Sequence, residues 1–116
     1  MDGVGITLSA LRGFEKKTAV TANNVANIES DGYKSRRATL TEGVGGGVEV
    51  EISTTTDPGP VRVVQEGDAV KQVELSNVDL SREMPEASLS STYHAANLKV
   101  LSTRDEMLGT LLDMVG

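Results

Sequence analysis

Apolar residues in the first part of the chain recur at spacings of three and four, which places them on one face of a helix. The residues that follow this spacing, with Phe14 beside them, are Leu8, Leu11, Thr18, Ala22 and Val25. Residues 15–17 are charged and interrupt the apolar residues on the other side of the helix, and Gly13 weakens the pattern. The pattern predicts a helix over residues 4–28. Ser30-Asp31-Gly32 would end it, because glycine readily takes the left-handed conformation found at helix ends.

The middle of the chain changes to the alternation that is typical of strands. Apolar and polar residues alternate strictly in residues 47–53, which predicts a half-buried strand after a flexible glycine-rich link, residues 43–47. Residues 57–60, Asp-Pro-Gly-Pro, are a strong turn signal. Residues 61–65 resume the extended pattern, so we expect them to form a hairpin with residues 47–53. The weaker signals beyond it are a turn at residues 66–68 and a third strand over residues 69–75.

Helical periodicity returns from Asp79 onward. Asp79 and Ser81 are both suitable N-caps, and Glu83 would lie in the first turn, where the helix dipole favours anions. Pro85 either sits in the first turn of a helix that begins near Met84 or separates a short helix from a longer one. Apolar residues then form a long stripe that ends at Val115. The pairs Val100/Leu101, Met107/Leu108 and Met114/Val115 repeat every seven residues, a coiled-coil-like period.

The predicted architecture is a mainly α-helical fold with a small β insert. We expect one unit over residues 1–116: an N-terminal helix and asparagine-rich motif (1–33), a β insert with a short hairpin (34–78) and a C-terminal helix (79–116). The two long helices would pack as an antiparallel, coiled-coil-like pair. Each carries more apolar stripe than one neighbouring helix can cover. The surplus predicts contacts with other subunits, and hence a homo-oligomer.

Composition and charge exclude several classes of function. The formal net charge is −6, and the short basic cluster at residues 34–37 is no basic stripe, which argues against nucleic-acid binding. The chain has no cysteine, and aromatic residues make up 3% of it. No apolar run is long enough to span a membrane. The first residues lack the charged and apolar regions of a signal peptide, so any export would use another route.

No set of residues has the spacing of an active site. His94 is the single histidine, and no metal-binding spacing accompanies it. The glycine-rich stretch lacks the Gly-Lys-Ser/Thr of a phosphate loop, and Tyr33-Lys34 has no dinucleotide fingerprint beside it. We therefore expect no enzymatic activity, no cofactor, no metal and no small-molecule substrate.

Three amides are crowded near the end of the first predicted helix. Asn23 and Asn27 are four residues apart and share a helix face, whereas Asn24 points elsewhere. One interpretation is a fraying helix end, where asparagine side chains bond locally to the backbone. The other is an interface in which buried amides fix the register of neighbouring helices, as polar residues do in coiled coils. The residues alone leave both open.

Two stretches resemble bacterial flagellar axial proteins, the rod, hook and hook-associated family. The N-terminal match is Ala22-Asn23-Asn24-Val25-Ala26-Asn27 followed by Gly32-Tyr33-Lys34. The C-terminal match is Ser76-Asn77-Val78-Asp79-Leu80, then Tyr93, Asn97 and Asp105-Glu106-Met107-Leu108. The middle, GVEVEIS followed by DPGPVRVV, is most similar to the proximal rod protein C type. The chain departs from that type in a shorter segment near residues 67–73, in Pro85 and in Thr18.

The resemblance implies a structural, non-enzymatic subunit of the flagellar basal-body rod. Such a subunit would assemble through its terminal helices, enclose the export channel and transmit torque. The implied partners are other rod and hook-family subunits and the type III export apparatus, with a periplasmic location in the basal body. An alternative is an accessory adaptor or capping protein that uses the same helices. The predicted subunit-interface residues are Leu11, Phe14, Asn23, Asn24, Val25, Asn27, Tyr33, Tyr93, Asn97, Leu101, Met107, Leu108 and Leu111.

Overall fold

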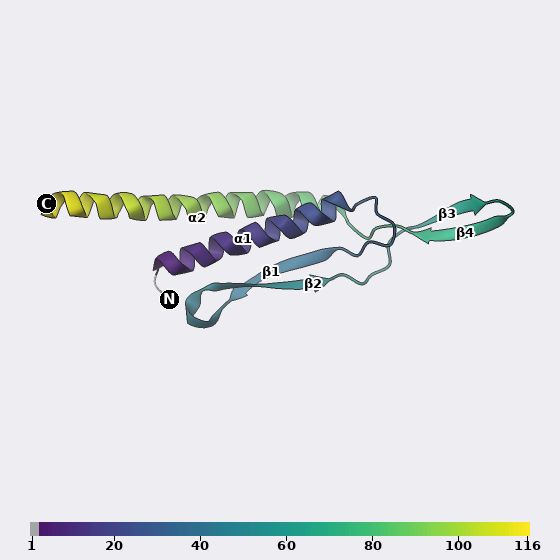
Figure 1. Cartoon of the computed structure of the whole chain (residues 1–116), viewed down its shortest axis with the longest axis horizontal. Coiled ribbons are helices and arrows are strands. Elements are labelled where there is room, and N and C mark those ends of the chain that lie inside the picture. The colour runs from purple at the N-terminus through teal and green to yellow at the C-terminus, as the bar shows by residue number, and fades with distance from the viewer. Residues whose placement is uncertain (1–2) are drawn as a thin grey trace.

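The computed structural model describes residues 3–116 and consists of two long helices with two β hairpins between them (Figure 1). The helices are α1 (Gly3–Ala26) and α2 (Leu80–Val115). The first hairpin pairs β1 (Arg36–Glu42) with β2 (Val48–Thr54) around a short 3₁₀ turn, η1 (Val44–Gly46). The second pairs β3 (Val61–Glu66) with β4 (Ala69–Glu74). The predicted fold class, two terminal helices packed together around a small β insert, is confirmed.

The molecule is elongated, with extents of 84 × 24 × 17 Å. Its radius of gyration is 21.0 Å, whereas a compact domain of this length would have about 13 Å. The β3–β4 hairpin lies at one end and the C-terminal part of α2 at the other (Figure 1). The buried apolar core is correspondingly small, because within residues 3–116 it consists of Ala10, Leu11 and Ala38.

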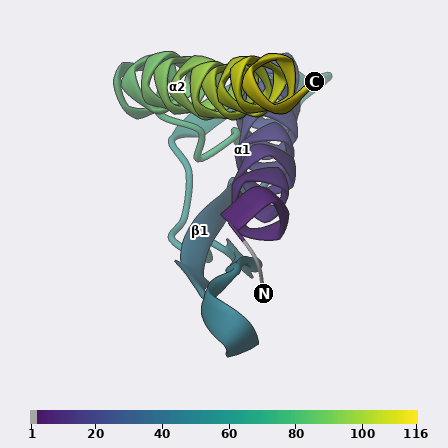
Figure 2. The same ribbon diagram turned by 90° about the vertical axis from the view of Figure 1, so that its left-hand side faces the viewer.

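Helix α1 lies between α2 on one side and the β1–β2 hairpin on the other, and the view along the long axis shows the same order (Figure 2). Ser9 joins α1 to the hairpin, because its hydroxyl accepts a 3.0 Å bond from the Val48 amide and donates to the Ile6 carbonyl at 2.7 Å. Gly13 is buried against the same hairpin. A Cβ there would lie 3.2 Å from both Leu40 and Val48, so glycine lets helix and hairpin approach closely.

The predicted pairing of residues 47–53 with residues 61–65 is wrong. Strand β2 pairs instead with β1, which the sequence pattern did not indicate, and β3 pairs with β4. The physical reason is the glycine-rich stretch, which is a tight turn and not a flexible link. Gly45 and Gly46 have φ values of 83° and 85°, and the Gly43 amide donates to the Gly47 carbonyl at 2.6 Å. The chain therefore reverses at once, and β2 runs back along the residues just before the turn.

The turn and third strand predicted from the weaker signals are confirmed. Gly67 and Asp68 connect β3 to β4, with Glu66 opposite Ala69. Gly67 has a φ of 65°, and it occupies the first of the two turn positions, where a type II′ hairpin turn requires glycine.

Both predicted helices form, but their details differ from expectation. Helix α1 ends at Ala26, well before the glycine of the Ser30-Asp31-Gly32 turn, and Gly32 adopts a φ of 70° in the segment that follows. Asp79 caps α2 by accepting a 3.1 Å bond from the Ser81 amide. Both alternatives for Pro85 are wrong, because α2 is continuous through it. Pro85 lies in the second turn, where it removes only the bond that its amide would make to the Ser81 carbonyl.

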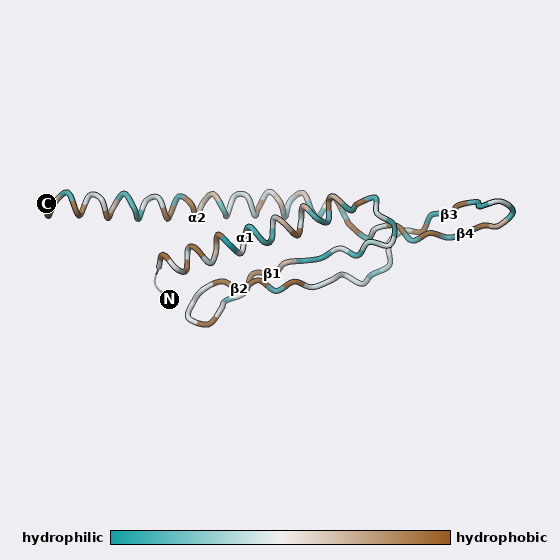
Figure 3. Tube along the Cα trace, in the orientation of Figure 1, coloured by the Kyte–Doolittle hydropathy of each residue, from teal (hydrophilic) through white to brown (hydrophobic). Residues whose placement is uncertain are grey.

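Apolar positions recur along α2 as far as its C-terminal end, where no second helix accompanies it (Figure 3). Its 36 residues span about 54 Å at 1.5 Å per residue. No helix in the described part of the chain is both long and apolar enough to cross a membrane.

Candidate assembly site

Three side-chain contacts align α1 with α2 in antiparallel orientation. The rings of Phe14 and Tyr93 stack with centroids 5.4 Å apart. An ion pair of 2.9 Å joins Lys17 Nζ to Glu86 Oε2. His94, next to Tyr93, lies 3.6 Å from the Glu15 carboxylate, so it contacts the other helix like its neighbour. Two predicted interface residues, Phe14 and Tyr93, are thus brought together within one chain.

Many of the buried residues of the two helices are polar. The buried residues of α2 are Glu83 and Ser90. On α1, Thr7, Thr21 and Asn24 are buried together with Ala10, Leu11 and Gly13. Large apolar residues on the helices are exposed, among them Leu8, Leu89 and Val100, and also Val4 and Leu98, which line one open pocket between α1 and α2. The intrachain pairing therefore leaves most of the apolar stripe of α2 uncovered.

Asn24 makes four hydrogen bonds within its own chain and is 1% exposed. Its Nδ2 donates to the Arg36 carbonyl at 2.7 Å and to Glu83 Oε1 at 3.2 Å. Its Oδ1 accepts from the Arg36 amide at 3.0 Å and from the Tyr33 hydroxyl at 3.1 Å. A carboxamide has two donor hydrogens and two acceptor lone pairs, so the group is fully used. It ties the end of α1 to β1 and to the first turn of α2.

The other two amides bond to each other and to nearby residues. Asn27 Nδ2 donates to the Asn23 carbonyl at 2.8 Å and to Asn23 Oδ1 at 3.1 Å, while Ser30 Oγ donates to Asn27 Oδ1 at 3.0 Å. All three amides therefore have partners within the chain, contrary to the expectation that those partners lie on other subunits. A role for these asparagines in subunit contacts stays a prediction.

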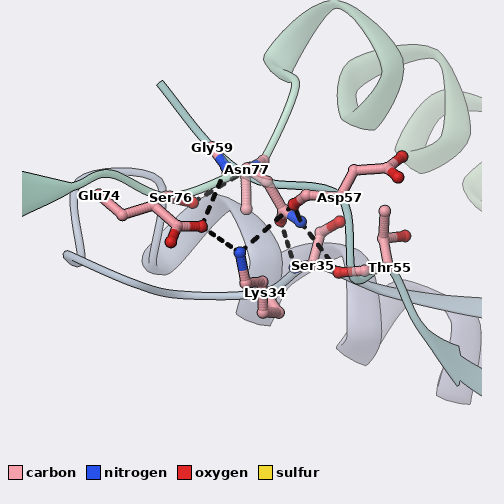
Figure 4. Close-up of polar contacts among 9 residues, drawn as sticks. Lys34, Ser35, Thr55, Asp57, Gly59, Glu74, Ser76 and Asn77 are labelled. Atoms are coloured by element: carbon pink, nitrogen blue, oxygen red, sulfur yellow. Dashed lines mark hydrogen bonds and ion pairs between the residues drawn. The ribbon is translucent and has the colours of Figure 1, made fainter. Parts of the chain in front are cut away.

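The segments that connect helices and hairpins cross at one place, which we call the junction: residues 31–35, 55–60 and 74–79 (Figure 4). Asn77 is its central side chain. Its Oδ1 accepts from the Ser35 amide at 2.6 Å, and its Nδ2 donates to the carbonyls of Thr55 and Asp57, each at 2.9 Å. One side chain thus joins the three segments of the junction.

Lys34 and Glu74 form an ion pair across the junction, and the Gly59 amide donates to the same carboxylate at 3.1 Å. The hydrogen bond from Lys34 is the largest cause that lowers the pKa of the Glu74 carboxyl. The bond from the Gly59 amide and the positive charge of Lys34 lower it further. Gly59 itself is buried. A Cβ on it would lie 2.2 Å from the Leu75 carbonyl oxygen, so no other residue fits without moving the backbone.

Sequence reasoning did not single out Glu83, Gly59 or Asn77 as contact residues. Glu83 was assigned only to the helix dipole, and Gly59 only to a turn. The Pro-Gly-Pro spacing around Gly59 was the one available signal, because a glycine between two prolines suggests a close backbone approach as well as a turn. Asn77 entered solely through the family resemblance.

The remaining predicted interface residues fall into two groups. Leu11 is buried in the chain, and Val25, Tyr33, Asn97 and Leu101 are half-buried. Met107, Leu108 and Leu111 are exposed, together with Leu112, Met114 and Val115. We call these six exposed residues the α2 stripe. The helix pairing stops near Gly3, which lies against Arg104, so α2 continues past the first described residue of α1 without a partner helix (Figure 1).

No group of three or more histidine, aspartate and glutamate side chains in residues 3–116 is placed to hold a metal ion. The site consists of surfaces suited to packing, and its polar residues form hydrogen bonds and ion pairs between segments of the chain.

Two family models match the chain, one at each end. The model described as "Flagella basal body rod protein" matches residues 6–34, which contain α1 and the asparagine-rich motif. The model described as "Flagellar basal body rod FlgEFG protein C-terminal" matches residues 71–114, which run from β4 through α2. A comparison with curated proteins gives no match. The bond between Asn24 and Glu83 joins the two matched segments, and the chain belongs to the flagellar basal body rod protein family, with a structural role in the rod.

Proposed function

We propose that the chain is a self-assembling subunit of the rod, and that its terminal helices pack with those of other copies and of other rod and hook-family subunits. In this proposal the helices of many subunits form an inner tube around the export channel, and the tube transmits torque. Export through the flagellar type III apparatus would place the subunit in the periplasmic part of the basal body.

The observation that carries the proposal is the α2 stripe. Its six large apolar side chains are exposed, and all of them except Leu108, which lines a pocket together with Val4 of α1, lie along a stretch of helix with no partner in the described chain. Burying one such side chain contributes about 1.5 to 3 kcal/mol, so leaving all six in water is costly. A continuous apolar face that is exposed to solvent marks an interaction site. Because the stripe lies on a helix, the helices of neighbouring subunits are its natural cover.

Rod assembly in cells that carry stripe variants tests this proposal. Leu108→Asp and Leu111→Asp each place a charge on the stripe, and both side chains are exposed, so the monomer should still fold. We expect rods to stop growing where this subunit joins, with loss of motility. Asp113→Lys is the control for a change of charge, because Asp113 is exposed and lies about 140° around the helix from Leu108 and about 160° from Leu111. Normal rods and motility with both leucine variants would reject the proposal.

The alternative role, an accessory adaptor or capping protein, predicts a different copy number. A rod subunit should appear in several stoichiometric copies in purified basal bodies, whereas an accessory factor should be substoichiometric or absent. Quantitative mass spectrometry of basal bodies separates the two. The assignment to the proximal rod protein C type stays a prediction, which imaging of the rod in a deletion strain would test.

A further inference from the structure

Helix α2 extends past the start of α1, and we call residues 105–115 of α2 the overhang. Gly3, the first described residue of α1, lies against Arg104. Beyond that point no element of the described chain runs beside α2 (Figure 1). The overhang is about 16 Å long at 1.5 Å per residue. It carries all six residues of the α2 stripe, and they are exposed.

Two rows of residues along α2 face α1, and both rows continue into the overhang. Residues within a row are seven positions apart, and the two rows alternate at spacings of three and four, which is the pattern of a coiled-coil seam. The first row is Glu83, Ser90, Asn97, Arg104 and Leu111, and the second is Ala87, His94, Leu101, Leu108 and Val115. Glu83 and Ser90 of the first row are buried. His94 of the second row lies 3.6 Å from Glu15 of α1. The seam that meets α1 is therefore the one that the overhang leaves open.

The seam changes its chemical character where α1 begins. The first row is polar or charged from Glu83 to Arg104, along the length of α1, and becomes apolar only at Leu111. The residues that border the seam in the overhang are apolar too, namely Met107, Leu112 and Met114 (Figure 3). The overhang is thus suited to a helical partner that covers it with apolar side chains, as α1 does not.

An open pocket of about 570 Å³ lies where the seam passes from α1 to the overhang. Its apolar residues are Val4 from α1 and Leu98, Leu101 and Leu108 from α2. Arg104 also lines it, and this arginine has no ion pair within residues 3–116. The start of α1 therefore leaves room beside the seam for side chains from a partner.

A helix that covers the overhang must run antiparallel to α2. Helix α1 already occupies the seam up to Arg104, so the preceding residues of a parallel partner helix would enter the space of α1. An antiparallel partner avoids this clash if it ends at the start of α1, because its preceding residues then extend away from the molecule. The overhang of a second copy meets this condition, since α2 ends at Val115 and the overhang has the required length.

We infer that two copies of the chain form a closed dimer in which the overhangs pack antiparallel about a two-fold axis. In the register that joins the two seams, the axis passes between Gly109 and Thr110. Leu108 of each copy then packs against Leu111 of the other, and Val115 packs against Arg104. The end of each overhang lies at the pocket of the other copy, and both copies of the α2 stripe are covered.

The charges of the overhang agree with this arrangement. Glu106 and Asp113 lie on the side of the helix away from the seam, and Asp105 would face the apolar Leu112 of the other copy. Arg104 would reach the last turn of the other α2, which has no basic residue of its own. A cation is favoured there, because the end of a helix carries a partial negative charge. Each arginine thus gains a partner that its own chain does not supply.

The inference rests on the proposed function in taking the α2 stripe as a surface that other copies cover. A two-fold contact uses the same surface on both copies and closes, whereas a growing rod needs contacts that propagate. The dimer would therefore be a form of the subunit outside the rod, and its separation would free the stripe for assembly.

Cysteine cross-linking of the full chain tests the register, because the natural sequence has no cysteine. Arg104→Cys and Val115→Cys replace two exposed residues that the dimer places opposite each other. We expect a mixture of the two proteins to form the mixed disulfide at least about tenfold faster than either protein links to itself, because like positions would lie about 16 Å apart along the helices. Glu106→Cys is the control, since position 106 faces away from the seam, and it should link to Val115→Cys no faster than like positions do.

Sedimentation equilibrium of the natural chain measures the dimer itself. The contact is smaller than a standard interface, so we expect a weak dimer with a Kd of about 10 to 100 µM. Leu111→Asp would place a charge in the seam and should raise the Kd at least about tenfold. Asp113→Lys is the matched control and should change the Kd by less than about twofold at physiological salt, because position 113 lies away from the seam.

Three results would overturn the inference. They are a mixed disulfide no faster than the control, self-linking of Arg104→Cys as fast as the mixed pair, and a natural chain that stays monomeric throughout that concentration range. A monomer in solution together with arrested rods in Leu111→Asp cells would remove the dimer and leave the rod function. A dimer that Leu111→Asp disrupts, with normal rods in the same cells, would remove the rod function of the stripe and leave the dimer.

Discussion

Asn24 and Glu83 lie 59 positions apart in the chain and are joined by a 3.2 Å hydrogen bond between Nδ2 and Oε1. The same carboxamide pairs with both backbone groups of Arg36 and with the Tyr33 hydroxyl. One buried side chain thus sets the end of α1, the start of β1 and the first turn of α2 against one another. Asn24 and Tyr33 of the N-terminal motif therefore bond to each other within the chain.

Replacing Asn24 should destabilise the monomer. Asn24→Leu leaves the amide and carbonyl of Arg36, the Tyr33 hydroxyl and the Glu83 carboxylate without this partner, and buried unpaired groups are costly. We expect a loss of about 3 kcal/mol in the free energy of unfolding, measured by urea titration followed by circular dichroism. Asn23→Leu is the control, because Asn23 is exposed, and it should change the stability by less than about 0.5 kcal/mol. Equal losses in both variants would mean that the buried hydrogen bonds of Asn24 do not stabilise the chain.

Two glycines should respond in opposite ways to the same change. Gly59→Ala places a Cβ 2.2 Å from the Leu75 carbonyl oxygen, so the backbone of the junction must move. We expect a loss of about 2 to 3 kcal/mol in unfolding free energy. Gly109→Ala meets nothing within 4 Å inside α2, and it should stabilise the chain by about 0.5 to 1 kcal/mol. Thermal unfolding of the pair measures both, and a stable Gly59→Ala protein would contradict the packing argument.

Replacing Ser90 with alanine should stabilise the chain. Its hydroxyl is buried between the helices and has no hydrogen-bond partner within residues 3–116. Removing it relieves an unpaired buried group, so Ser90→Ala should raise the free energy of unfolding by about 1 kcal/mol. Ser91→Ala is the control, since Ser91 is exposed on the same helix and the exchange changes only helix propensity. A gain no larger than that of the control would show that Ser90 carries no desolvation penalty.

The helices were predictable because their signal is local. A period of three to four residues appears in any stretch of the sequence long enough to show it, and the N-cap Asp79 stands where the period begins. Gly13 seemed to weaken α1, but its position against Leu40 and Val48 gives it a packing role that no helical pattern contains.

The hairpin pairing and the amide contacts were not predictable, because both depend on residues far apart or on turn geometry. Strand β1 begins with two arginines, which hid the apolar positions Ala38 and Leu40. Its pairing follows from the tight glycine turn, which looked like a flexible link. Likewise, the partners of Asn24 come from β1 and from α2, and nothing in the residues around it identifies them.

The junction should lose stability in acid through Glu74. The Lys34 and Gly59 bonds hold the pKa of the folded carboxyl below the unfolded value, which is about 4.3 for glutamate. The unfolded chain therefore binds this proton more readily than the folded chain does. The stabilisation is fully present above about pH 4.3, and it is lost as the pH falls through the lowered pKa.

Glu74→Gln isolates this contribution. The variant keeps the size of the side chain and removes the titrating group, so its unfolding free energy, measured in a full denaturant series, should fall less between pH 6 and pH 2 than that of the natural chain. Glu66→Gln, at the exposed hairpin tip, is the matched control and should leave the pH dependence unchanged, because that carboxylate has no partner within the described chain. Identical pH profiles for the natural chain and for Glu74→Gln would mean that the Lys34 pair does not stabilise the junction.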